Sequence, residues 1–134
     1  MRPRIQEELT LLRQFYPDVQ HAAPAGDDWF FLPQYALPPG WRLGEQEVSA
    51  SALCFSVSGG YPTALPYAFL LPDGINFGGV VPANTTTSAN SPFSGAWLQF
   101  SWSPETWFPQ SDARKGSNLL VWVRSFQHRL KEGA

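Results

Sequence analysis

Residues 60–74 read GYPTALPYAFLLPDG, a proline-stiffened turn followed by a short apolar strand and a second turn. Proline fixes its own φ angle and pushes the preceding residue toward extended geometry. The pairs Tyr61-Pro62 and Leu65-Pro66 therefore cannot lie inside a helix. We interpret residues 60–66 as a rigid corner that sets the direction of the strand after it.

Two segments outside this corner have the periodicity of amphipathic helices. Residues 3–16 place Ile5, Leu9, Leu12 and Tyr16 at steps of four, three and four, and residues 117–130 do the same with Leu119, Val123, Phe126 and Leu130. This spacing puts the apolar side chains on one helix face, and Glu8 is assigned to a different, polar face. We predict that Pro3 and Tyr16-Pro17 bound the first helix, and that Ser111 or Ser117 caps the second.

The region between the helices predicts an antiparallel meander of about four strands. Residues 17–27 are read as a linker, residues 29–32 as a short aromatic strand and residues 38–40 as a turn. Residues 47–58 alternate between large and small side chains, a pattern typical of a strand with one strongly apolar face. The sequence thus predicts a single α+β domain over residues 1–134.

Between the corner strand and the second helix the chain has a polar part and an aromatic part. Residues 72–95 are rich in Gly, Asn, Ser and Thr, and we interpret them as a long loop. Residues 93–108 are rich in aromatic rings, among them Trp97, Trp102 and Trp107. We expect most of these rings to pack beneath the loop, and any exposed ring to serve as an anchor for a partner protein.

Composition and charge exclude several classes of function. The formal net charge is −2, so no basic field attracts nucleic acid or an anionic membrane, and no apolar run approaches the roughly 20 residues that span a bilayer. His21 and His128 have no ligand at metal-binding spacing and no cofactor fingerprint is present, so neither a metal nor a cofactor is predicted. A single cysteine and a polar N-terminal segment lead us to expect a cytoplasmic protein.

The order of these segments resembles that of a ubiquitin-conjugating domain, also called an E2 or UBC domain, and the corner is similar to the Tyr-Pro-x-x-x-Pro signature of that family. More narrowly, the chain resembles prokaryotic E2 family E through DWFFLP at 28–33, LPPGW at 37–41, GYP at 60–62 and FSW at 100–102. The resemblance implies a UBC-like fold of the E2 and RWD type, in a bacterial ubiquitin-like conjugation system. The implied partners are an E1-like activating enzyme and a ubiquitin-like protein, with an active E2 or a JAB-type metallopeptidase as further candidates. Partner binding is assigned to Tyr61, Pro62, Pro66, Trp97, Trp102 and Trp107.

The catalytic residues of an active E2 are missing where the resemblance places them. An E2 uses a cysteine thiolate as nucleophile and an Asn of a His-Pro-Asn triplet to stabilise the oxyanion. Counting on from Tyr61 leads to PANTTTS at residues 82–88, which contains Asn84 but neither the His nor the Cys. We therefore predict a non-catalytic adaptor that binds an E1-like enzyme or a ubiquitin-like protein.

Three alternatives stay open. In the first alternative, Cys54 is a relocated nucleophile that forms the thioester, and Asn84 is the oxyanion donor. A lone cysteine inside a strand is, however, usually a packing residue. A hydroxyl of the TTTS run at residues 85–88 accepts the acyl group as an ester, although no general base is visible near it. In the third alternative the chain is an unrelated module whose aromatic surface binds a peptide or a sugar.

Overall fold

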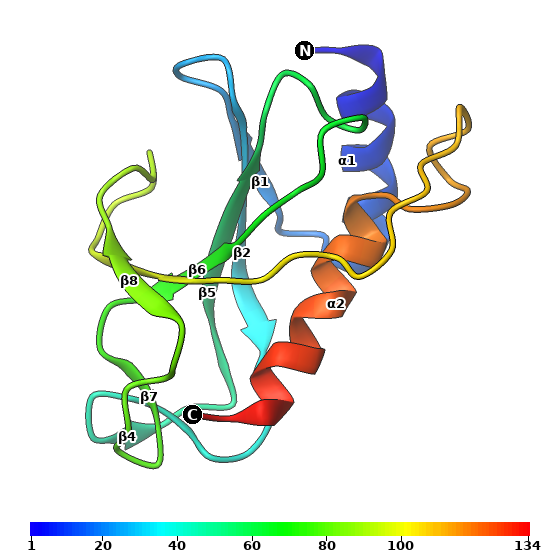
Figure 1. Ribbon diagram of the computed structural model, residues 1–134. Helices are drawn as coiled ribbons and strands as arrows, with labels where there is room; N and C mark the ends of the chain where they lie inside the picture. The colour runs from blue at the N-terminus through cyan, green and yellow to red at the C-terminus, as the bar shows by residue number, and fades with distance from the viewer.

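Two helices lie on one face of an antiparallel sheet in the computed structural model, which describes residues 1–134 (Figure 1). The elements in chain order are α1 (Pro3–Phe15), β1 (Gln20–Ala22), β2 (Asp28–Ala36), β3 (Trp41–Leu43), β4 (Gln46–Glu47), β5 (Ala50–Val57), β6 (Phe69–Pro72), β7 (Ile75–Phe77), β8 (Thr85–Ser88), β9 (Trp97–Phe100) and α2 (Leu119–Glu132). The main sheet has the strand order β1-β2-β5-β6-β9-β8, and β4-β3-β7 form a second, smaller sheet. All strand pairs are antiparallel. The prediction of an α+β fold with an N-terminal and a C-terminal helix is confirmed.

Both helices form where the apolar periodicity predicts them. Proline occupies the start of α1, and the backbone N–H of Tyr16 closes the helix by donating to the carbonyl of Leu12. The predicted cap of α2 is wrong by one residue, because Asn118 accepts the N–H of Val121 at 2.9 Å. Ser117 instead accepts the backbone N–H of Phe108, which fixes the chain just before the helix.

The alternation predicted for the central strand β5 is confirmed. Leu53, Phe55 and Val57 point into the main core between the sheet and the helices. Phe126 of α2 fills the centre of this core, and its ring centroid lies 5.7 Å from that of Phe55. Full burial of one such ring contributes about 1.5–3 kcal/mol to stability. The opposite face of the strand carries Cys54, which lies in a separate small cluster.

Two buried polar groups attach α2 to the strands beneath it. The hydroxyl of Tyr35 donates to the carbonyl of Val123 at 2.7 Å, and Nε1 of Trp41 donates to the carbonyl of Leu130 at 3.0 Å. These large side chains bury their apolar parts in the core and satisfy their polar ends on the helix backbone. They fix the position of α2 along the sheet.

The sheets are larger than the predicted meander of about four strands. The presumed linker at residues 17–27 contains β1, and the presumed loop at residues 72–95 contains β7 and β8. β8 pairs with β9 along its whole length, so its backbone groups are satisfied by a partner that follows it in sequence. Strand β2 is longer than predicted, and its register shifts between Leu32 and Tyr35, around a proline that has no N–H to donate to the ladder.

The histidine of the presumed linker lies in a strand, is half-buried and has an acidic partner. His21 is part of β1, and its Nε2 lies 2.7 Å from Oδ1 of Asp28 across the first strand pair. The backbone partner of His21 is Phe30, and this pairing brings the His21 side chain near the start of β2.

Neither helix has the length and apolar character that crossing a membrane requires.

Candidate functional site

The Tyr-Pro corner is held in place by a buried carboxylate of α1. Glu8 is only 1% exposed, and its Oε1 accepts the hydroxyl of Tyr61 at 2.6 Å and the backbone N–H of Leu119 at 2.5 Å. Its other oxygen, Oε2, accepts Nε of Arg4 at 2.6 Å. Burial and the neighbouring Glu8 carboxylate raise the pKa of Tyr61 above its usual value. One carboxylate thus joins α1, the corner and the N-terminus of α2, where a negative charge is favourable.

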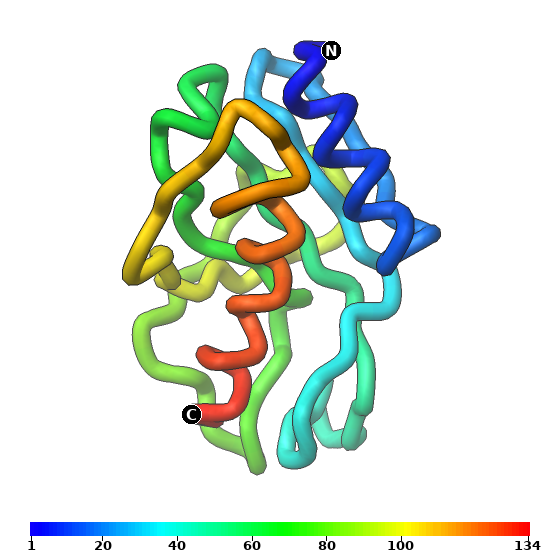
Figure 2. The backbone as a smooth tube through the Cα atoms, turned by 90° about the vertical axis from the view of Figure 1, so that its right-hand side faces the viewer, coloured from blue at the N-terminus to red at the C-terminus, as the bar shows by residue number.

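The tryptophan-rich segment between β9 and α2 is anchored at two points. Nε1 of Trp107 donates to the carbonyl of Pro62 at 2.8 Å, and its ring centroid lies 5.9 Å from that of Tyr61. Nε1 of Trp102 donates to Oγ of Ser125 on α2 at 3.1 Å. The segment therefore runs back along α2 from the sheet to the corner, as its yellow to orange trace shows in Figure 2.

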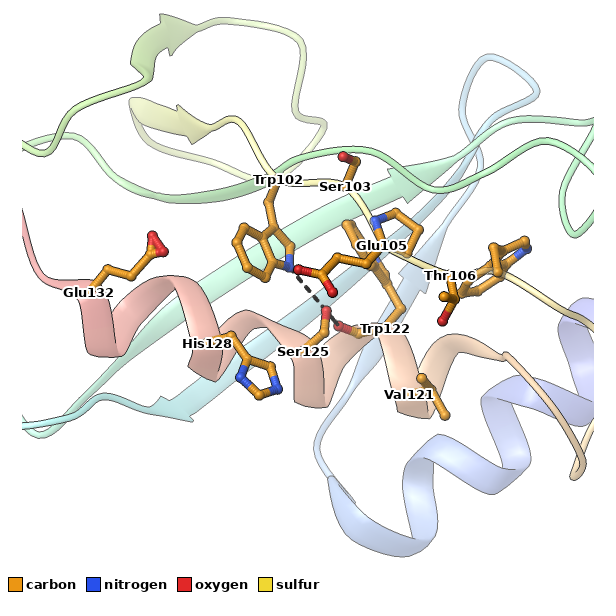
Figure 3. A pocket seen from close by; sticks show the side chains of 11 residues that line it. Trp102, Ser103, Glu105, Thr106, Val121, Trp122, Ser125, His128 and Glu132 are labelled. Carbon is orange, nitrogen blue, oxygen red and sulfur yellow. Dashed lines mark hydrogen bonds between the residues drawn. The ribbon is translucent and has the colours of Figure 1, made fainter.

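A cleft of about 400 Å³ opens between residues 102–107 and α2, and we call it the aromatic cleft (Figure 3). The helix contributes Val121, Trp122, Ser125, His128 and Glu132, which follow each other at the spacing of one helix face. The segment opposite contributes Trp102, Glu105 and Trp107, with the residues between them. The cleft therefore combines indole rings with two carboxylates.

Trp122 is the one cleft residue whose polar group is buried without a partner. The residue is 1% exposed, and its Nε1 has no hydrogen-bond acceptor in the protein. An unsatisfied buried donor costs about 1–3 kcal/mol. Two other indole N–H groups of the cleft, those of Trp102 and Trp107, are both satisfied. A bound group with an acceptor oxygen would remove this cost.

Cys54 lies on the far side of the sheet from the aromatic cleft, in the cluster that it forms with Leu70 and Trp97. Its side chain is 0% exposed. Burial raises the pKa of the thiol to about 12, and only a contact of 3.5 Å with Oγ of Ser91 opposes this effect. A thiol in this environment is protonated at neutral pH and is not accessible to a macromolecular substrate.

Asn84 does not lie beside Cys54. Asn84 immediately precedes β8, whereas Cys54 is in β5, and β6 and β9 separate the two strands. Three strand spacings amount to about 14 Å. The carbonyl of Asn84 accepts the N–H of Ser101, and its side chain is exposed. The TTTS run at residues 85–88 is β8 itself, the outermost strand of the main sheet.

The structure brings together four of the six residues assigned to partner binding. Tyr61, Pro62, Trp102 and Trp107 meet along the corner and the aromatic cleft. Pro66 is buried in the same corner region, and Trp97 lies apart with Cys54. Sequence reasoning missed Glu105, Trp122, His128 and Glu132. Together with Ser125, the helical members of this set follow one another at steps of three, three and four, which is a signal that the sequence already contains.

No group of three or more His, Cys, Asp or Glu side chains is arranged to hold a metal ion. Comparisons of the chain with protein-family models, curated proteins and solved structures gave no match.

Proposed function

We propose that the chain is a non-catalytic, E2-like component of a bacterial ubiquitin-like conjugation system, with a UBC-like fold and a cytoplasmic location. It binds an E1-like enzyme, a ubiquitin-like protein, or both, and an active E2 or a JAB-type peptidase is a further candidate partner. The proposal is supported by the element order, in which an N-terminal helix, an antiparallel meander, the Tyr-Pro corner and a C-terminal helix follow one another. The motifs at residues 28–33, 37–41, 60–62 and 100–102 support the narrower comparison with prokaryotic E2 family E.

The observation that carries the non-catalytic assignment is the burial of the only cysteine. Thioester formation needs a thiolate that reaches the carboxyl terminus of another protein. Cys54 is fully buried on a central strand, and its pKa is raised to about 12. The proposed partner surface is the aromatic cleft, because tryptophan is enriched among the residues that contribute most to protein interfaces, and half-buried Trp102 and Trp107 line this cleft beside exposed Val121.

Direct binding measurements test this proposal. The purified protein is titrated by calorimetry with the E1-like enzyme and with the ubiquitin-like protein of the organism that encodes it. Val121→Lys places a long charged side chain at the aromatic cleft, and Val80→Lys is the matched control at another exposed valine. We expect binding of at least one partner, a loss of at least tenfold in affinity for Val121→Lys, and no change for Val80→Lys. Absence of binding by both partners would overturn the proposal.

The active alternative is tested in the same preparation by adding ATP. We expect no reductant-sensitive adduct between the ubiquitin-like protein and this chain. An adduct that disappears in Cys54→Ala would show that Cys54 is a nucleophile, and would replace the adaptor proposal by an active E2. An adduct resistant to reductant but sensitive to hydroxylamine would indicate an ester, with the hydroxyl groups of residues 85–88 as the candidate acceptors.

The third alternative, a module that binds a peptide or sugar on a row of exposed aromatic rings, is less well supported. Of the six tryptophans, Trp41, Trp97 and Trp122 are buried, and Trp29, Trp102 and Trp107 are half-buried. We expect iodide to quench the tryptophan fluorescence far less in the folded protein than in urea. Quenching in the folded state that equals the value in urea would favour the exposed row.

A further inference from the structure

The aromatic cleft carries a charge pattern that its apolar lining alone does not require. Glu105 and Glu132 are both exposed and both line the cleft, whereas no Lys or Arg contributes to its wall. In Figure 3 the ring of Trp102 lies between the two carboxylates, above the helix face that carries Ser125 and His128. A positive group in the cleft would therefore meet carboxylates at both ends and the indole ring of Trp102 between them.

Indole rings and carboxylates together are suited to a cation. The face of a tryptophan attracts an ammonium or guanidinium group through its quadrupole, and Trp is the strongest of the aromatic residues in this respect. Carboxylates at the rim steer a positive partner and disfavour an acidic one. Each contribution is modest on an exposed surface, so the cleft depends on their combination.

The buried Nε1 of Trp122 adds an independent indication of the ligand. Trp122 lines the cleft, and its buried Nε1 has no acceptor in the protein. A cation offers no acceptor, so a free amine or metal ion would leave the donor unsatisfied. A peptide offers a backbone carbonyl close to each of its side chains, and can supply the acceptor and the cation together.

We infer that the aromatic cleft binds a lysine or arginine side chain of a partner polypeptide, with a backbone carbonyl of the same segment accepting Nε1 of Trp122. This inference rests on the proposed function in taking the cleft as a protein-binding site, and it adds the chemistry of the partner segment. The basic side chain lies against the indole ring of Trp102, between Glu105 and Glu132.

A peptide titration followed by NMR tests the inference. The probe is acetyl-Gly-Gly-Lys-Gly-Gly-amide, and its uncharged counterpart carries norleucine in place of lysine. We expect the lysine peptide to shift the indole N–H resonances of Trp102, Trp107 and Trp122 saturably, and the norleucine peptide to bind at least fivefold more weakly. Butylamine, which has no carbonyl, is expected to shift the first two resonances and to leave that of Trp122 in place.

Charge variants complete the test. Glu105→Gln and Glu132→Gln are each expected to weaken the lysine peptide about two- to fivefold. Glu45→Gln, at an exposed glutamate outside the cleft, is the matched control and is expected to have no effect. Equal binding of the norleucine peptide, an equal effect of Glu45→Gln, a shift of the Trp122 resonance by butylamine, or no saturable shift up to about 10 mM would each overturn the inference.

The peptide titration and the calorimetric experiment test the two proposals independently. The peptide measurement uses neither an E1-like enzyme nor a ubiquitin-like protein. If those partners bind and Val121→Lys abolishes their binding while the peptide gives no shift, only the basic-peptide inference is overturned. If the peptide binds in the cleft but neither partner does, the cleft chemistry stands and the E2-like assignment is overturned.

Discussion

Glu8 shows how a single residue links segments that are far apart in sequence. It follows Ile5 by three positions and precedes Leu12 by four, so it lies on the buried stripe of α1, although its charge suggested the polar face. The sequence could not reveal its partners, because the hydroxyl of Tyr61 and the N–H of Leu119 come from other parts of the chain. The sequence did contain one signal of a buried role for Glu8, namely an acidic residue at a position of the apolar stripe.

Replacing Glu8 by glutamine should destabilise the protein strongly. The groups around the Glu8 side chain are all hydrogen-bond donors, so the NH2 group of a glutamine finds no acceptor among them. The substitution also leaves the half-buried charge of Arg4 without its counter-ion. We expect Glu8→Gln to lower the free energy of unfolding by about 3–5 kcal/mol in urea denaturation. Glu7→Gln, at the exposed neighbour, should change it by less than about 0.5 kcal/mol. Equal effects of the two variants would contradict the role of the buried carboxylate.

Cys54 should make stability depend on pH in the alkaline range. The unfolded thiol ionises near pH 9.0 and the folded one near 12, so within this window the folded state binds more protons than the unfolded state. The free energy of unfolding therefore falls as pH rises. The stability difference between wild type and Cys54→Ala should be constant below about pH 8 and shrink by up to about 1.4 kcal/mol per pH unit above pH 9. Urea denaturation from pH 7 to 10.5 measures it, and a difference independent of pH would contradict a buried, protonated thiol.

At the level of elements, α2 has two faces with different tasks. Leu119, Val123, Phe126 and Leu130 face the core at steps of four, three and four. Val121, Ser125, His128 and Glu132 repeat the same steps two positions later and line the aromatic cleft. The first stripe was predictable because apolar periodicity is local. The second contains one apolar residue, so hydrophobicity alone could not identify it.

The start of α2 gives a direct test of the corrected cap. Asn118→Ala removes the acceptor for the N–H of Val121 and the donor to the carbonyl of Ala113. We expect a loss of about 1–2 kcal/mol in the free energy of unfolding, measured by urea denaturation. Ser117→Ala should cost less, because the bond that it loses to Phe108 is exposed. A larger effect at Ser117 would mean that the capping assignment is wrong.

Strands β7 and β8 show the limit of local patterns. The composition of the TTTS run predicts a polar loop, yet Thr85 pairs with Phe100 and Ser88 with Trp97. Threonine is β-branched and suits a strand, but the pairing partner lies beyond the next turn and a single segment does not specify it. For the same reason, sequence reasoning located Trp102 and Trp107 but could not bring them against α2.

For the whole molecule, the consequence of the Glu8 connections is cooperativity. α1, the corner and α2 share one carboxylate, and both helices pack on the same core. Opening either helix therefore removes hydrogen bonds from the other. Packing between distant segments, rather than local helix propensity, holds the helical layer in place.

Native-state hydrogen exchange should reveal this coupling. The amides of Leu12 and Val123 are expected to open with similar free energies, and Glu8→Gln should reduce both by the same amount. Glu7→Gln should leave both unchanged. If the amide of Leu12 lost its protection in Glu8→Gln while that of Val123 kept it, the helices would be independent units and the coupling would be contradicted.

Because the only thiol of the protein is buried, thiol-specific reagents should not label the native folded protein. Cys54 is inaccessible, whereas Val121 at the aromatic cleft is 48% exposed. A maleimide dye or nitroxide added to the folded Val121→Cys variant should therefore attach at one place, without prior removal of the natural cysteine. Spectroscopy on that single label would follow what enters the cleft in the otherwise unaltered chain.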